Sequence, residues 1–189
     1  TLYSLQELEE LSAVCRERDL KLFVDGARLA YALASPVNDV TLADLARLTD
    51  VFYIGGTKCG SLFGEAVVIP ERGSIRQFVT QMKQHGALLA KGRLLGVQFE
   101  ALFEDGLYLT IGEPAVKATA RIREALKRAG YVVTMDSPTN LTFVALDQAG
   151  HERLSDKVRY SIWETLPDGR YLARIGTSWA TPEEDVVAF

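Results

Sequence analysis

The chain has 189 residues, of which 48% are hydrophobic and 24% are charged, with a formal net charge of -4. This composition is typical of a globular protein with a sizeable core, and it excludes the basic surface that nucleic acids or anionic membranes require. We find no apolar run long enough to span a bilayer and no signal-peptide pattern. Cys15 and Cys59 lack the spacing of a metal site or disulfide framework, so we expect reduced thiols in a cytoplasmic protein.

The first element is predicted to be an amphipathic helix over residues 5–18. Ser4 and Glu7 form a capping-box pattern, and leucines recur on one face of the helix that follows. Cys15 lies on that inner face, where we interpret it as a small core residue rather than a reactive thiol. The helix is expected to cover a sheet.

Two short apolar runs, 21–24 and 51–54, are predicted to be central strands of a parallel sheet, buried on both faces. A polar tip follows each run, Asp25 to Arg28 in the first case and Gly55 to Lys58 in the second. Ligands of such sheets bind beyond the carboxyl ends of the strands, so both tips are expected to open onto one crevice. The sequence therefore predicts a carboxylate, a guanidinium and an amine in one site.

The remaining pattern alternates helices and strands. Helices are predicted at 41–48, from 75 to about 104 with a break near His85, from about 113 to a stop at Gly130, at 150–159, and after Thr181. Strands are predicted at 65–69, 131–135, 141–146 and 172–175. We therefore expect an α/β protein. His85 and His151 are interpreted as ordinary helix-end residues.

Each residue of the predicted site also has a plain structural interpretation. Asp25 could cap the helix after it, Arg28 could form a surface ion pair, and Lys58 could be an exposed loop lysine. A phosphate-binding loop or dinucleotide fingerprint around Lys58 is excluded, because the glycine spacing of neither motif is present. The three groups together suit an enzyme that uses pyridoxal 5'-phosphate (PLP), which needs a lysine amine, a carboxylate at the pyridine nitrogen and an arginine for a substrate carboxylate.

A resemblance to a known family strengthens this interpretation. The segment FVDGARL at 23–29, followed by TDVFYIGGTK at 49–58, resembles the core of the threonine aldolase and β-eliminating lyase family of fold-type-I PLP enzymes. The resemblance covers essentially the whole chain and implies a mostly parallel sheet with flanking helices and a smaller C-terminal α/β domain. Residues 1–108 are expected to be the C-terminal portion of the PLP-binding large domain, and 109–189 the small domain. We expect the N-terminal part of such an enzyme to lie outside these residues.

The resemblance assigns cofactor roles to five residues, which are Asp25, Ala27, Arg28, Thr57 and Lys58. Lys58 would link covalently to PLP and serve as the catalytic lysine. Asp25 would pair with the pyridine nitrogen, and Ala27 would leave room for the ring. Thr57 would donate a hydrogen bond to the phosphate, although it could equally just complete its turn. No metal is expected.

Two arginines are assigned to the substrate in the same way. Arg28 would contact the phenolic oxygen of the cofactor and the substrate carboxylate, and Arg174 would bind the α-carboxylate. From the residues alone, an arginine alternating with apolar neighbours on a strand is as well explained by a solvated sheet face.

The activity implied is cleavage of a β-hydroxy-amino acid such as L-threonine to glycine and an aldehyde. The sequence departs from the family at 85–93, HGALLAKGR, which favours a related subgroup over a simple threonine aldolase. Lys91 or Arg93 there would contact a partner's phosphate or simply form a solvated helix face. The alternatives are β-elimination or racemisation with the same cofactor, and a non-catalytic α/β domain. A homodimer or homotetramer with shared active sites is expected.

Overall fold

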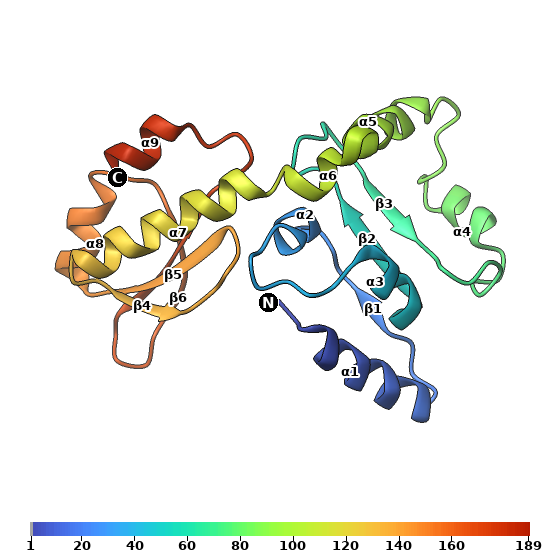
Figure 1. Cartoon of the computed structure of the whole chain (residues 1–189), viewed down its shortest axis with the longest axis horizontal. Helices are drawn as coiled ribbons and strands as arrows, with labels where there is room; N and C mark the ends of the chain where they lie inside the picture. The colour runs from blue at the N-terminus through green and yellow to red at the C-terminus, as the bar shows by residue number, and fades with distance from the viewer. Residues whose placement is uncertain (1) are drawn as a thin grey trace. The chain divides into compact units, whose positions relative to one another are not determined.

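The computed structural model describes residues 2–189 and contains two compact units. We call them the first unit, residues 3–33 and 39–110, and the second unit, residue 2 with residues 34–38 and 111–189. In Figure 1 most of the first unit runs from blue to green and most of the second from yellow to red. The assignment of residues 1–108 and 109–189 to a large and a small domain stays a prediction.

The first unit is built on a three-stranded sheet in the order β1-β2-β3. Its strands are β1 (Phe23–Val24), β2 (Val51–Gly55) and β3 (Glu65–Val68). Its helices are α1 (Leu5–Glu17), α2 (Leu29–Leu33), α3 (Leu42–Leu48), α4 (Phe78–Gln84), α5 (Arg93–Phe103), the 3-10 turn η1 (Glu104–Gly106) and α6 (Leu107–Thr110).

Local signals set the helix starts of this unit. Capping boxes begin two helices of this unit: Ser4 with Glu7 before α1, as predicted, and Thr41 with Asp44 before α3. The predicted break near His85 is also confirmed, because α4 ends at Gln84 and α5 begins only at Arg93.

Pairing within the sheet is mixed. β1 runs parallel to β2, as predicted, with Phe23 opposite Val51, whereas β2 and β3 are antiparallel. One face packs against α1, α2 and α3 through a core that includes Leu8, Leu45 and Phe52. These helices hold the carboxyl ends of β1 and β2 in fixed positions.

The expectation that both predicted strands are buried on both faces is wrong for β1. This strand is at the edge of the sheet formed by residues 2–189, and the side chain of Phe23 is 50% exposed. Phe23 packs edge-on against Tyr53, and Val67 is also exposed. The core formed by α1, α2 and α3 includes Phe52 but neither Phe23 nor Val67, so these helices cover only one face of the sheet.

The second unit has a four-stranded antiparallel sheet in the order β4-β5-β7-β6. Its strands are β4 (Val132–Met135), β5 (Leu141–Leu146), β6 (Ser161–Thr165) and β7 (Tyr171–Gly176). Its helices are α7 (Glu113–Arg128), α8 (Gln148–Ser155) and α9 (Glu183–Ala188). In Figure 1 the long helix α7 runs across β4 and β5.

The core of the second unit lies between its helices and one face of the sheet. Ile122 and Leu126 of α7 pack there with Val144 of β5 and with Ala173 and Ile175 of β7. Side chains alternate across a strand, so Phe143 and Arg174 face the opposite side. Arg174 therefore lies on the sheet face away from this core.

The predicted helix at 150–159 is too long, and one strand was missed. α8 ends at Ser155, and residues 161–165 form β6 instead. All five residues of β6 are exposed, so the strand has no buried-exposed alternation, and pairing with β7 is what defines it. No helix of residues 2–189 is long and apolar enough to cross a bilayer.

Candidate functional site

Two turns begin where β1 and β2 end, and a backbone hydrogen bond joins them. The amide of Gly55, the last residue of β2, donates to the carbonyl oxygen of Gly26 at 3.0 Å. The same carbonyl accepts from the amide of Leu29, the first residue of α2, at 2.9 Å. The turn that carries Asp25 and Arg28 therefore lies beside the turn that carries Lys58.

Glycine is required at both positions because the two backbones touch. A Cβ atom on Gly26 would lie 1.9 Å from the carbonyl oxygen of Tyr53, and one on Gly55 would lie 2.5 Å from that of Ala27. Backbone atoms cannot move aside as the end of a flexible side chain can. The absence of side chains at Gly26 and Gly55 therefore permits the two turns to meet.

Asp25 and Arg28 are both exposed, on the first turn. The Oδ1 atom of Asp25 accepts from the amide of Ala27 at 3.0 Å, so the carboxylate does cap its own turn. The Oδ2 atom of Asp25 and the guanidinium of Arg28 have no polar partner among residues 2–189. Their cofactor and substrate roles stay predictions.

Lys58 has a fixed backbone and a free side chain. Its carbonyl oxygen accepts a hydrogen bond from the hydroxyl of Tyr31, which is 1% exposed. Its amine is exposed and has no ion pair or hydrogen bond within the described part of the chain. The turn therefore presents an amine that no group of these residues occupies.

The carboxylate of Glu65, at the start of β3, holds the two residues before Lys58. Its Oε2 atom accepts from the amide of Gly56 at 2.7 Å, and its Oε1 atom accepts from the hydroxyl of Thr57 at 2.8 Å. Thr57 thus completes the turn in this structure, which was the plainer of its two interpretations. Its predicted contact with a phosphate would require the hydroxyl to turn away from Glu65.

Two further buried groups contact this turn. The hydroxyl of Tyr108, a fully buried side chain of α6, donates to the carbonyl oxygen of Gly55 at 2.8 Å. Burial raises the pKa of Tyr108 far above its usual range, so the hydroxyl keeps its proton. Burial likewise raises the pKa of Cys59 to about 11, and its Sγ lies 3.3 Å from the same carbonyl oxygen. Cys59 is therefore a packed neutral thiol and not a nucleophile.

Sequence reasoning missed Tyr31, Glu65 and Tyr108 as parts of this site. Nothing in the local pattern marks them, since their partners are 8 to 53 positions away in the chain, as in the bond from Tyr108 to Gly55. The acidic residue that begins β3 was the one available signal: it opens an otherwise apolar strand directly after a glycine-rich turn.

Arg174 belongs to the second unit. It is half-buried on β7, where it pairs with Phe143 of β5 and Ser161 of β6. The central carbon of its guanidinium lies 4.8 Å from the ring centroid of Trp163. No carboxylate of residues 2–189 pairs with it.

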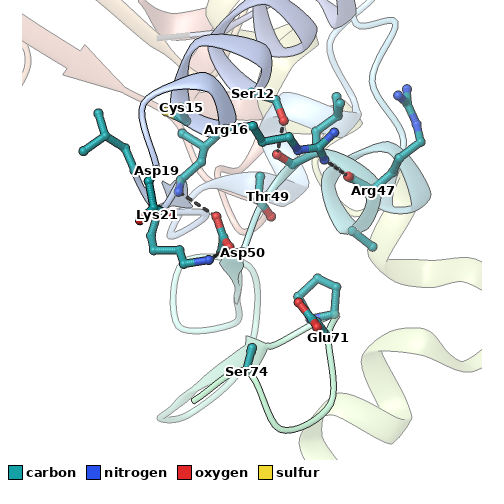
Figure 2. A pocket seen from close by; sticks show the side chains of 15 residues that line it. Ser12, Cys15, Arg16, Asp19, Lys21, Arg47, Thr49, Asp50, Glu71 and Ser74 are labelled. Carbon is teal, nitrogen blue, oxygen red and sulfur yellow. Dashed lines mark hydrogen bonds and ion pairs between the residues drawn. The ribbon is translucent and has the colours of Figure 1, made fainter. Parts of the chain in front are cut away.

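A cavity of about 340 Å³ in the first unit is not this site. It lies where β1 and β2 begin, and none of the predicted site residues lines it. Figure 2 shows several of its charged side chains paired with neighbours: Arg16 donates to the carbonyl oxygen of Arg47 at 2.8 Å, and Lys21 pairs with Asp50 at 3.1 Å. Arg16, Lys21 and Asp50 therefore already have polar partners within the protein.

The model of the beta-eliminating lyase family matches residues 1–149. The chain belongs to this family. Its predicted membership is thus confirmed, and both turns of the candidate site lie within the matched region.

Similar proteins agree with this assignment. A low specificity L-threonine aldolase from a Pseudomonas species is 36% identical over 98% of this chain. The solved structure of a Leishmania major threonine aldolase covers 97% of the chain at 46% identity with a TM-score of 0.92. A Sphingomonas wittichii serine palmitoyltransferase, 15% identical over 95% of the chain and 48% of its own, shares the fold with a TM-score of 0.65. The predicted α/β fold-type-I class is confirmed.

The match covers only part of each threonine aldolase. The chain spans about half the length of these relatives, 53% of the Pseudomonas protein and 54% of the Leishmania chain. The activity of the whole protein is therefore treated as a proposal.

The close approach of the two turns predicts a strong effect of Gly55→Ala. The new methyl group would overlap the backbone at Ala27, so we expect the free energy of unfolding to fall by about 2 kcal/mol or more in urea titrations. Gly96→Ala is the matched control. Gly96 lies on the exposed side of α5 with no atom within 4 Å of a new Cβ, so alanine should stabilise by about 0.5–1 kcal/mol. Equal effects of the two substitutions would contradict the close packing.

Glu65→Gln tests how the turn of residues 55–58, which we call the lysine turn, is held. The amide oxygen can still accept from the amide of Gly56, but the NH2 group cannot accept, so the hydroxyl of Thr57 has to turn and accept from it, and both bonds lose their charged acceptor. We expect a loss of about 1–2 kcal/mol in the free energy of unfolding. Glu100→Gln, at an exposed position of α5, is the control and should change it by less than about 0.5 kcal/mol. A Glu65→Gln protein as stable as wild type would argue against this role.

Proposed function

We propose that the protein carrying this chain binds PLP at Lys58 and cleaves β-hydroxy-amino acids such as L-threonine to glycine and an aldehyde. Membership of the beta-eliminating lyase family and similarity to two threonine aldolases support the proposal. The single observation that carries it is the unpaired amine of Lys58 on a rigidly held turn beside Asp25.

The residues of the two turns fit the chemistry of PLP. A flat ring needs a surface without side chains, and backbone atoms of Gly26, Ala27 and Gly55 are in contact there. A protonated ring nitrogen needs a carboxylate, and one oxygen of Asp25 has no partner within residues 2–189. An aldehyde needs an amine that no other group holds, as is the case for Lys58.

Each cofactor residue has one part in this proposal. Lys58 holds PLP covalently, Asp25 keeps a proton at the ring nitrogen, and Ala27 leaves the ring face open. Thr57 donates to the phosphate once its hydroxyl turns from Glu65. When bound, PLP supplies a sink for the electron pair that the substrate's Cα retains after its bond to Cβ breaks.

Arg28 and Arg174 are proposed to bind and orient the amino acid, and Arg28 would also contact the phenolic oxygen of the cofactor. A guanidinium grips a carboxylate with two parallel hydrogen bonds, and neither arginine has a carboxylate partner within the described part of the chain. In the net reaction the β-hydroxyl loses a proton, the Cα–Cβ bond breaks, an aldehyde leaves and Cα gains a proton. The products are glycine and that aldehyde.

β-Elimination is the second candidate function, because the family that the chain belongs to bears that name. It would use the same lysine and arginines and break a bond at Cβ to a leaving group instead of the Cα–Cβ bond. Amino-acid racemisation is a further alternative of the same cofactor chemistry.

A homodimer or homotetramer with shared active sites in the cytoplasm completes the proposal. An exposed apolar surface beside the lysine turn supports the oligomer. Leu94 and Val97 of α5 are 68% and 43% exposed, and Leu62, held to the same helix through Gln98, is 87% exposed. An apolar surface of this kind usually meets another protein surface.

Lys58→Ala should abolish covalent attachment of the cofactor. We expect the purified variant to lose the visible absorbance band of lysine-bound PLP, and borohydride should no longer fix the cofactor to the protein. Lys21→Ala is the control, since Lys21 pairs with Asp50 and lines the separate cavity; it should keep both signals. A Lys58→Ala protein that keeps borohydride-reducible cofactor would overturn the assignment. Absence of bound PLP from the wild type would favour a non-catalytic domain.

Product analysis separates the candidate reactions. With L-threonine, aldol cleavage should release glycine and acetaldehyde in equal amounts, because carbon–carbon scission produces one of each. A β-substituted alanine should release its leaving group and pyruvate only if the protein catalyses β-elimination. If the β-substituted alanine gives pyruvate and L-threonine gives no aldehyde, the proposed activity would be replaced by β-elimination. If the only change is inversion of the Cα centre of the amino acid, it would be replaced by racemisation.

A further inference from the structure

Arg174 is held by an aromatic ring and not by an acid. Its guanidinium lies over the ring of Trp163 at 4.8 Å, and Phe143 packs edge-on against that ring with 6.1 Å between centroids. Trp163 is nevertheless 57% exposed, an unusual degree of exposure for so large an apolar group. A half-buried cation without a carboxylate partner retains its capacity to bind an anion.

The backbone of β6 is irregular where Trp163 lies. Ile162 pairs with Ala173 of β7 and Glu164 pairs with Leu172, with a shift in register between them. Such a bulge locally re-aims a side chain, and bulges are frequent beside active sites. The irregularity thus falls at the residue whose ring contacts Arg174.

We propose that Trp163 is a positioning residue for Arg174, whose ring fixes the guanidinium plane so that its N–H edge binds the α-carboxylate of an amino acid. This inference rests on the proposed substrate role of Arg174. Stacking occupies a face of the guanidinium and leaves the N–H groups in its plane free for a two-pronged grip. The contact also restricts the long side chain of Arg174 before the ligand is present. Less conformational entropy is therefore lost when the carboxylate binds.

Calorimetric titration of the cofactor-loaded protein with glycine tests this role, because glycine carries the α-carboxylate and nothing beyond Cα. Trp163→Leu should raise the Kd for glycine about 5- to 30-fold, as expected for loss of a cation–π contact. Trp163→Phe keeps an aromatic face and should recover most of the affinity. Ile162→Val, on the opposite side of the same strand, is the matched control and should leave the Kd unchanged.

A double-mutant cycle decides whether Trp163 acts through Arg174. In an Arg174→Leu background, Trp163→Leu should cause no further loss of glycine affinity. Full additivity, or an unchanged Kd in Trp163→Leu, would overturn the inference. Failure of the wild type to cleave L-threonine would overturn the proposed aldol reaction alone, since the glycine titration still decides the role of Trp163. Failure of glycine to bind the wild type would overturn both.

Discussion

The carbonyl oxygen of Gly26 is the atom on which the candidate site depends. It accepts from Gly55 at the end of β2 and from Leu29 at the start of α2, and so ties two strand ends and a helix together. This bond forms only because neither glycine has a side chain, as the distances to Tyr53 and Ala27 show. Two turns that are thirty positions apart in the chain therefore become one surface.

The lysine turn combines a rigid backbone with an uncommitted side chain. Tyr31, Glu65 and Tyr108 each bind a backbone group of residues 55–58, whereas the amine of Lys58 has no partner within residues 2–189. A group that must form a covalent bond benefits from this arrangement, because its anchor is fixed while its reactive atom stays free. The same division holds for Arg174, whose strand is central and whose guanidinium lies over an aromatic ring without a carboxylate partner among residues 2–189.

In each of the two units, the helices of the core pack on one face of the sheet, and the other face carries exposed aromatic residues. In the first unit these include Phe23 beside Tyr53, and in the second Trp163 beside Phe143. Helical cover on one side leaves the other available for ligands or further protein. The chain spans about half the length of its threonine aldolase relatives, and the uncovered sheet faces are consistent with the larger size of those proteins.

The sequence by itself determined the features that short segments encode. The capping boxes of α1 and α3, the apolar runs of β1 and β2 and the two polar turns depend on neighbouring residues, and they form where the pattern placed them, except that β1 is shorter than the predicted 21–24 and covers only Phe23–Val24. Tertiary structure alone decided the edge position of β1, the strand β6, and the contacts of Tyr108 and Trp163. These depend on pairing between segments far apart, such as the bond from Tyr108 to Gly55 across 53 positions, which no local periodicity can encode.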